Sequence, residues 1–430
     1  RPQNTAPPGN EPPLPPEVTM IHARPSAQPA PRSPFGFVGR AGRAARALTT
    51  VASALALAAG ALTVAPAPAH AADPITTQEY FSYYHLDSAR EKGYTGKGVT
   101  IALIDGPVNT DAPELKGANV TDKSSCTIEA SPSDVQHATG MAAILVSPYF
   151  GVAPDATLHA YQTSTTSKSS VGTCLSGGEQ LDTVGKLMNQ AIEDGAQIIS
   201  ISQGVNSSDE VKWAVANAIA HGVIVVSSAG NKAKDENANH LGQYSGVVGV
   251  SAINADGTFA SYSSWGNGVV TSAVGGPFNT VDPDTNQPVQ VQGTSTSTAL
   301  VAGMLALARQ KWPDATPNQI LQLLVHTGLN PNHDWNQYTG YGPIDGGALV
   351  NTDPSQYPDE NPILQKPGGS SPTEQELQDY ADGIITPSTV RNEMPKSYVY
   401  RGTDEDLIIG FGLDNGLNIH LGTSPRYHRK

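Results

Sequence analysis

Ser295 stands at the start of a stretch that could hold a hydroxyl beside a site for negative charge. Gly293, Thr294 and Ser295 lead into residues 296–305, which are all small or apolar and include no charged side chain. A helix without a charged face must be buried, and its N-terminus presents unpaired N–H groups and a positive dipole. The pattern therefore predicts a serine at a rigid, anion-stabilising point. Taken alone, the motif also fits a Thr/Ser cap on a core helix.

Three other polar residues stand at the ends or starts of similar stretches. Asp105 follows the continuous apolar run 99–104, which is typical of a central parallel strand buried on both faces. His137 begins a second run of small residues, and Asn231 closes the apolar run 222–231 on a Gly-bearing turn. Each of these residues, taken singly, is more typical of a turn, a cap or a structural histidine. Their order along the chain is the informative feature.

With the order Asp, His, Ser, the chain resembles the subtilisin-like serine peptidases. Further segments resemble landmarks of that family in the same sequence order, over roughly residues 86–350. They are residues 93–99, 151–156, 198–204, 260–266 and 340–345. The resemblance implies an α/β fold of three layers, with a mostly parallel central sheet and helices on both faces.

The resemblance also implies a role for each chemical residue. Ser295 would be the nucleophile, His137 would take its proton as general base, and Asp105 would orient the histidine and stabilise its cation. Asn231 would donate its side-chain N–H to the oxyanion, beside the backbone N–H of Ser295. The chain would then be a serine endopeptidase that acts through an acyl-enzyme.

Two short segments would line the cleft and pair with an extended peptide. By resemblance, their backbone groups would add the substrate as a further strand. The residues are Ser202, Gln203, Gly204, Ala229 and Gly230.

The chain also departs from the family pattern close to these residues. Gly106 and Pro107 follow the aspartate where the family usually has Ser or Thr and then Gly, and Ala138 follows the histidine where it usually has Gly. Ser297 and Ala299 stand where the family usually has Ala and Pro. A non-catalytic peptide-binding module on the same fold therefore stays open as an alternative. A mycosin-like partner of a secretion system is a further alternative that does not depend on these departures.

Helical patterns at residues 181–194, 209–221 and 316–327 alternate with the buried strands, which indicates a parallel sheet with helices on both faces. We place the peptidase domain at residues 73–350, after a leader at 1–72. Residues 351–430 would form a tail of unassigned function, with a linker at 353–372 and a short capped helix at 373–381. The run 72–85 is too short to bury a core of its own and would lie along the domain as an extended arm.

The leader predicts export. Residues 1–34 are rich in proline and should be disordered, and three arginines then precede the charge-free run 47–69. Ala69, His70 and Ala71 fit a signal-peptidase site, so we expect a secreted, extracellular protein without membrane contact after cleavage. An uncleaved membrane anchor remains the alternative, because the charge-free run is long enough to span a bilayer.

Charge and cysteine content fit a secreted enzyme. The net charge of −14 argues against nucleic acid as a partner and leaves a polypeptide substrate. The only two cysteines, Cys126 and Cys174, lie in polar stretches and most simply form one disulfide.

No cofactor or metal is expected. The connection at residues 145–150 is too short for the calcium-binding insertion that family members often carry. Asp282, Asp284 and Asn286 form an oxygen-rich loop without the spacing of a cation-binding motif, and we interpret this loop as a solvated turn.

Overall fold

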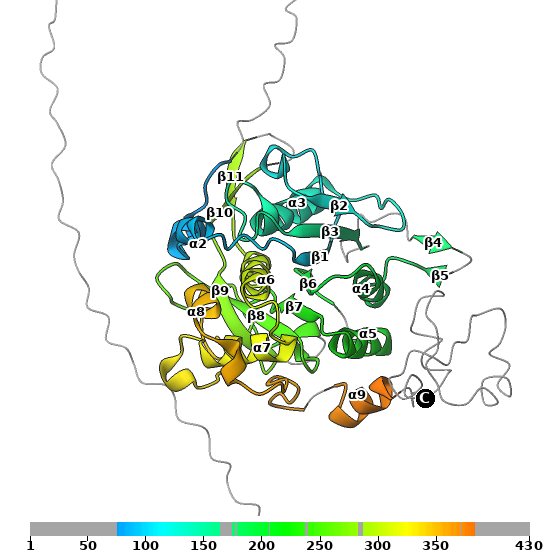
Figure 1. The fold of residues 1–430 in the computed structure, drawn as a ribbon. Coiled ribbons are helices and arrows are strands. Elements are labelled where there is room, and N and C mark those ends of the chain that lie inside the picture. Colours follow the sequence, from blue (N-terminus) through cyan, green and yellow to red (C-terminus); the bar gives the residue numbers. More distant parts are fainter. Residues whose placement is uncertain are drawn as a thin grey trace, which may run out of the picture. The chain divides into compact units, whose positions relative to one another are not determined.

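One seven-stranded sheet runs through the middle of the computed structural model (Figure 1). The structure describes residues 75–163, 174–176, 179–205, 207–236, 240–282, 287–369 and 371–382. Every pair of neighbouring strands in this sheet is parallel. In spatial order the strands are β2 (Val120–Asp122), β3 (Thr157–Gln162), β1 (Thr100–Asp105), β6 (Ile198–Ile201), β7 (Ile224–Ser228), β8 (Val248–Ile253) and β9 (Val269–Val274). The predicted parallel sheet is confirmed.

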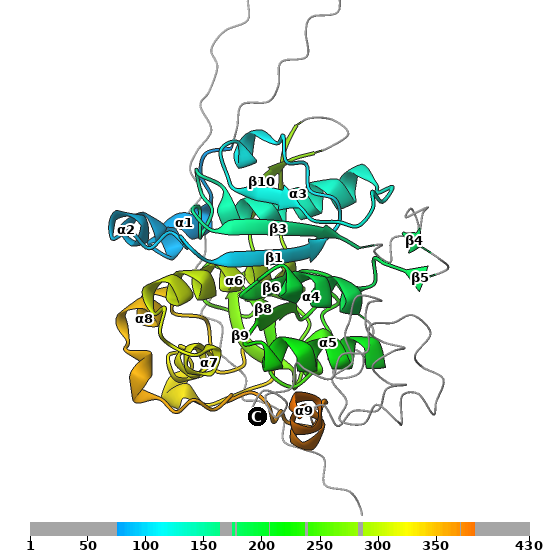
Figure 2. The same ribbon diagram turned by 45° about the vertical axis from the view of Figure 1, so that its right-hand side comes forward.

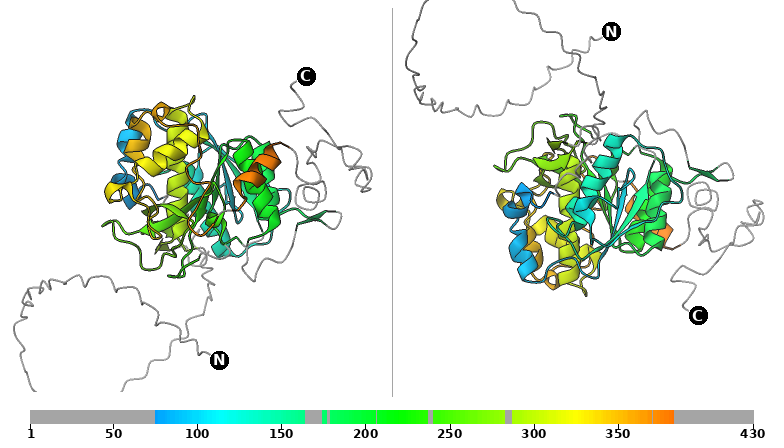
Figure 3. Two further views of the ribbon diagram at one scale, coloured as in Figure 1. Left: turned by 90° about the horizontal axis from the view of Figure 1, so that it is seen from below. Right: turned by 90° about the horizontal axis from the view of Figure 1, so that it is seen from above.

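Helices cover both faces of the sheet, so the fold has three layers. Alternate side chains of β1 point to opposite faces, as in any strand. Ile101 and Leu103 enter the core that includes α3 and α6, whereas Ala102 and Ile104 enter the core that includes α4 and α5. Figures 2 and 3 show α4 and α5 on one side of the strands. These helices are α3 (Pro132–Val146), α4 (Val184–Glu193), α5 (Asp209–Ala220) and α6 (Thr294–Lys311).

The central helix α6 is buried over nearly its whole length. Residues 294–308 are all buried, and the basic residues Arg309 and Lys311 come only in the last turn. The burial that the uncharged sequence of this helix predicted is therefore confirmed. The first turn of α6, which carries Ser295, is held rigidly by core packing.

The remaining described elements lie around this framework. Helices α4, α5 and α7 confirm the three helical patterns of the sequence. Two small antiparallel pairs, β4 with β5 and β10 with β11, lie outside the main sheet. Their bounds, with those of the other helices, are α1 (Glu79–Tyr83), α2 (Leu86–Glu91), β4 (Leu175–Ser176), β5 (Glu179–Gln180), β10 (Phe278–Val281), β11 (Pro288–Val291), α7 (Pro317–His326), α8 (Gly346–Asn351) and α9 (Glu374–Ala381).

The arm that leads into the domain is helical rather than extended over residues 79–83. Tyr80 is buried in this helix, and its ring lies in the α3/α6 core. Tyr84, four residues on, accepts a hydrogen bond from the backbone N–H of Val274 at 2.9 Å. A single helical turn lets both rings face the domain, since residues four apart share one face.

The segment after α8 packs against the domain instead of hanging free as a linker. The backbone N–H of Ser245 donates to the carbonyl of Ser371, and Lys366 is buried against the carbonyls of Gly242 and Val247. Helix α9 forms as predicted. Its Tyr380 stacks on Trp213 of α5 with ring centroids 6.1 Å apart.

The predicted leader at residues 1–72 and the tail beyond residue 382 lie outside the described residues. Within the described part of the chain, no helix combines the length and the apolarity needed to cross a bilayer.

Candidate active site

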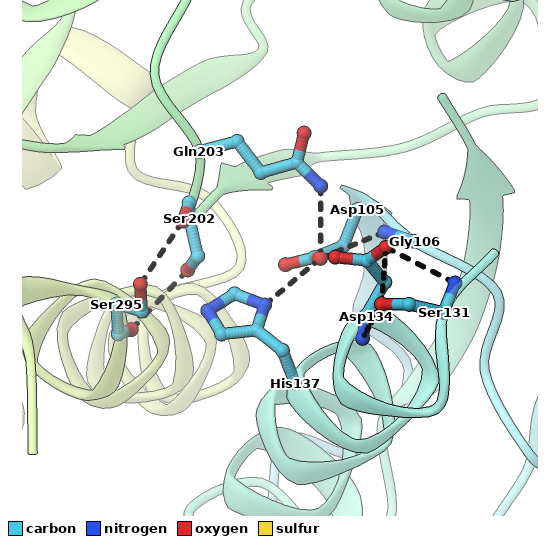
Figure 4. A network of polar contacts seen from close by, with 8 residues as sticks. All are labelled: Asp105, Gly106, Ser131, Asp134, His137, Ser202, Gln203 and Ser295. Carbon is cyan, nitrogen blue, oxygen red and sulfur yellow. Dashed lines mark hydrogen bonds and ion pairs between the residues drawn. The ribbon is translucent and has the colours of Figure 1, made fainter. Parts of the chain in front are cut away.

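Asp105 and His137 form a close pair at the carboxyl end of β1. Oδ1 of Asp105 lies 3.0 Å from Nδ1 of His137 (Figure 4). The aspartate side chain is only 2% exposed, whereas that of the histidine is 37% exposed. A buried carboxylate on Nδ1 fixes the imidazole so that Nε2 is left for chemistry.

His137 lies in the second turn of α3, not at its start as the sequence suggested. The helix begins earlier because Ser131 and Asp134 form a reciprocal capping box and Pro132 occupies the first turn. The Ser-Pro-Ser-Asp pattern is the sequence signal that marks this start. The side chain of His137 therefore projects from a helix whose N-terminus is already fixed by this cap.

The surroundings of the imidazole favour its cation. Burial by itself lowers the pKa of His137, but the charge and hydrogen bond of Asp105 and the charge of Asp134 outweigh it, and the pKa is raised.

Ser295 is the second residue of α6 and lines the same cavity as His137. The cavity holds about 240 Å³ and also includes Asn231, Gly293 and Phe278 in its lining. The hydroxyl of Ser295 donates to the carbonyl of Ser202 at 3.0 Å. The hydroxyl of Ser202 in turn donates to the carbonyl of Ser295 at 3.2 Å. The two serines are thus clamped together, and Oγ of Ser295 must turn away from Ser202 to reach the imidazole.

Asn231 is oriented by the residue that precedes the serine. Its Oδ1 accepts hydrogen bonds from the backbone N–H of Thr294 at 2.8 Å and from the Thr294 hydroxyl at 3.0 Å. A backbone N–H can only donate, so the oxygen of the amide must face Thr294. Nδ2 therefore points the other way and lies next to Gly293, where an added Cβ would come within 3.0 Å of it.

The first turn of α6 leaves one backbone donor open beside Asn231. Thr294 N–H bonds to Asn231, and Thr296 N–H bonds to the carbonyl of Gly293. The contacts among the described residues give the N–H of Ser295, between them, no acceptor. One backbone N–H and one side-chain N–H are thus available near the serine hydroxyl.

The predicted peptide-binding segments serve partly as internal supports. Gln203 donates from Nε2 to Oδ1 of Asp105 at 2.9 Å, which the sequence did not suggest. The N–H groups of Ala229 and Gly230 donate to Val250 and to the Thr294 hydroxyl. Gly204 borders open space, since a Cβ built on it would meet nothing within 4 Å.

The cysteines are paired as predicted: a disulfide joins Cys126 to Cys174. It ties the segment after β2 to the start of β4. In the parts of the chain that the structure describes, no three His, Cys, Asp or Glu side chains gather as a metal site would require. Part of the oxygen-rich loop, residues 283–286, lies outside those parts.

A histidine backed by a buried carboxylate, beside a serine at a helix N-terminus, is the geometry expected of serine hydrolases. The model described as "Subtilase family" matches residues 96–342, more than half of the chain. The chain therefore belongs to the subtilase family, and it is a serine endopeptidase.

Individual relatives agree with this assignment. The chain is 29% identical over 278 residues to the thermostable alkaline protease of Halalkalibacterium halodurans, covering 63% of this chain and 70% of that protein. It is 28% identical to subtilisin DY of Bacillus licheniformis, covering 61% of this chain and 95% of that protein.

Solved structures show the same fold. MycP1 from Mycobacterium smegmatis matches with a TM-score of 0.52 and 25% identity, over 69% of this chain and 89% of that chain. A lanthipeptide protease matches with a TM-score of 0.53 and 23% identity, over 63% of this chain and 93% of that chain.

Proposed function

We propose that this subtilase is a secreted endopeptidase that cleaves peptide bonds through an acyl-enzyme on Ser295. The observation that carries the proposal is the 3.0 Å contact between Asp105 and Nδ1 of His137, in a site whose cavity also holds Ser295 and Asn231. With Nδ1 engaged, Nε2 of His137 is the base available to the serine hydroxyl.

The reaction begins when the hydroxyl of Ser295 turns from Ser202 toward His137. Nε2 takes the proton while Oγ attacks the carbonyl carbon of the scissile bond, and the resulting imidazolium is stabilised by Asp105. The oxyanion that forms accepts hydrogen bonds from Nδ2 of Asn231 and from the backbone N–H of Ser295. The positive end of α6 favours the same negative charge.

The intermediate then collapses with cleavage of the C–N bond. His137 returns its proton to the leaving amine, so that the new N-terminus departs neutral and the acyl group stays on Ser295. Water then attacks the ester carbonyl while the same imidazole takes its proton. The C–Oγ bond breaks, and His137 gives this proton to Oγ of Ser295, which restores the hydroxyl and releases the carboxyl product. The proton balance closes, because His137 gives each proton that it takes.

Labelling with a fluorophosphonate probe tests the nucleophile. We expect one probe molecule per chain, found by mass spectrometry on the peptide that contains Ser295, and no label on Ser295→Ala. The matched control is Ser355→Ala, an exposed serine outside the site, which should label like the unmodified protein. An unlabelled, folded protein would favour the peptide-binding alternative instead.

The export part of the proposal rests on the leader sequence. The Arg-bearing segment, the charge-free run and the Ala-His-Ala site support cleavage after Ala71. Mass spectrometry of protein from the culture medium should find a mature chain that begins near Ala72. Retention of the whole leader in a membrane fraction would contradict this expectation and favour the anchor alternative.

A further inference from the structure

Gln203 is a residue of the site that the proposed mechanism does not use. It follows β6 by two residues and sends its side chain across to β1, where Nε2 lies 2.9 Å from Oδ1 of Asp105. That oxygen also accepts from the backbone N–H of Gly106 at 2.7 Å and contacts Nδ1 of His137 at 3.0 Å. Three donors therefore converge on one carboxylate oxygen (Figure 4).

A side-chain donor cannot come from the residue next to the aspartate. Gly106 has only its backbone N–H to give. A Cβ at this position would approach the carbonyl oxygen of Asp134 to 3.0 Å, because the capped start of α3 packs against it. A larger residue at position 106 would thus press on the helix that carries His137. A further donor for Asp105 has to reach it from another strand, and Gln203 does so.

The segment that carries Gln203 also holds the other end of the site. Ser202 exchanges two hydrogen bonds with Ser295, at 3.0 and 3.2 Å, and the next residue bonds to Asp105. Two consecutive residues therefore connect the start of α6 to the end of β1. Displacement of this segment would move the aspartate and the serine relative to each other.

We propose that Gln203 is a positioning residue for Asp105, an inference that rests on the proposed function. Its N–H fixes the orientation of the carboxylate and shares its negative charge, so that Oδ1 stays directed at Nδ1 of His137. The carboxylate is almost wholly buried, and a hydrogen bond to a buried charge is worth more than one in water. The amide itself does not ionise, so it adds no charge to the pair.

Two substitutions separate positioning from substrate binding. Gln203→Leu removes the donor at similar size, and Gln203→Glu keeps the length but offers a second carboxylate. Gln375→Leu on α9 is the matched control, since it removes an exposed glutamine amide far from Asp105 in the fold. Circular dichroism and melting curves establish that each variant is folded before any other comparison.

We expect Gln203→Leu to lower kcat by about 10- to 100-fold, the worth of a hydrogen bond to a charged group, with KM changed less than twofold. Both Gln203 variants should move the acid limb of the kcat/KM profile to higher pH, because more negative charge then faces the imidazole. The shift should be larger for Gln203→Glu, and the control should change neither quantity.

A second readout does not depend on turnover. The proton on Nδ1 of His137 gives a low-field NMR resonance when hydrogen-bonded to a carboxylate, and both Gln203 variants should shift it while Gln375→Leu does not. Unchanged kcat, acid limb and resonance in folded Gln203→Leu would overturn the inference. So would an effect confined to KM. If the unmodified protein proved inert toward probe and peptides, the proposed function would fail, and the resonance would still decide the role of Gln203.

Discussion

The two atoms of the Asn231 amide have different roles in the proposed mechanism, and substitutions can separate these roles. Its oxygen accepts from the N–H and the hydroxyl of Thr294 at 2.8 and 3.0 Å, while its nitrogen lies beside Gly293 and is the donor that we propose for the oxyanion. Asn231→Ala removes both atoms. Asn231→Asp keeps an oxygen for Thr294 but replaces the N–H donor by a second oxygen.

The expected magnitudes differ for activity and stability. Loss of one oxyanion donor raises the barrier by about 3–4 kcal/mol, so both variants should lose about 10²- to 10³-fold in kcat. Asn231→Ala also leaves Thr294 without its acceptor. The residue is exposed, so water replaces part of that contact and the loss of stability should be about 1 kcal/mol, or a melting temperature lower by about 2–4 °C. Asn231→Asp should melt like the unmodified protein, since a carboxylate is favourable at a helix N-terminus.

The assay pairs turnover of a chromogenic peptide, normalised to active sites by fluorophosphonate titration, with melting curves. Melting is measured in an Ser295→Ala background so that autolysis does not intervene. An Asn231→Asp protein that retains activity within about threefold of the unmodified enzyme would refute the assignment of Nδ2 as an oxyanion donor. Equal destabilisation by both substitutions would refute the separation of the two contacts.

Three further predictions follow from named groups. Asp105 raises the pKa of His137, and only the neutral imidazole acts as base, so the acid limb of the kcat/KM profile should have its midpoint above the ordinary imidazole value of about 6.5. Asp105→Asn should lower this midpoint. A midpoint unchanged by the substitution would show that Asp105 does not raise the pKa of His137. The disulfide between Cys126 and Cys174 spans 48 positions, so the double Cys→Ser variant should lose about 4 kcal/mol of unfolding free energy in denaturant titrations. An unchanged free energy of unfolding would show that other contacts already constrain this loop in the unfolded chain. Burial lowers the pKa of Lys366 to about 7, so between that pH and the ordinary lysine pKa the unfolded chain binds the lysine proton more readily than the folded chain, and stability should rise with pH across this window. Lys366→Met should remove this contribution to the dependence of stability on pH. An identical pH dependence in the variant would exclude Lys366 as the cause.

The elements that position the site were largely predictable, because their sequence patterns reflect burial. The run before Asp105 is typical of a strand covered on both faces, and the uncharged stretch after Ser295 predicts a buried helix. The helical pattern at residues 316–327 is confirmed as α7, in which Thr316 caps the helix and Pro317 opens it. These features depend on local periodicity and capping, which one sequence displays directly.

What the sequence did not reveal depends on contacts between distant segments. The bond from Gln203 to Asp105 joins residues 98 positions apart, and nothing in either local pattern indicates it. The packing of residues 353–372 against the domain was likewise hidden, because proline, glycine and serine favour an irregular path whether or not it is docked. The backbone bonds of Ser245 and Gly246 to that segment and the buried contacts of Lys366 reveal that it belongs to the fold.

The start of α3 could be predicted from the sequence only in part. The capping box of Ser131 and Asp134 is present in the sequence, but the run of small residues that begins at His137 predicted a later helix start. The helix begins at Pro132 because the cap, and not His137, satisfies the first free N–H groups.

A crystal structure of the protein inhibited with a small phosphonate is the most direct test of Ser295 as the nucleophile and Asn231 as an oxyanion donor. We predict a bond from phosphorus to Oγ of Ser295. The phosphonyl oxygen should lie within about 2.7–3.1 Å of both Nδ2 of Asn231 and the backbone N–H of Ser295. Nδ1 of His137 should still contact Asp105. An adduct on another residue, or a phosphonyl oxygen directed away from Asn231 into solvent, would contradict the account.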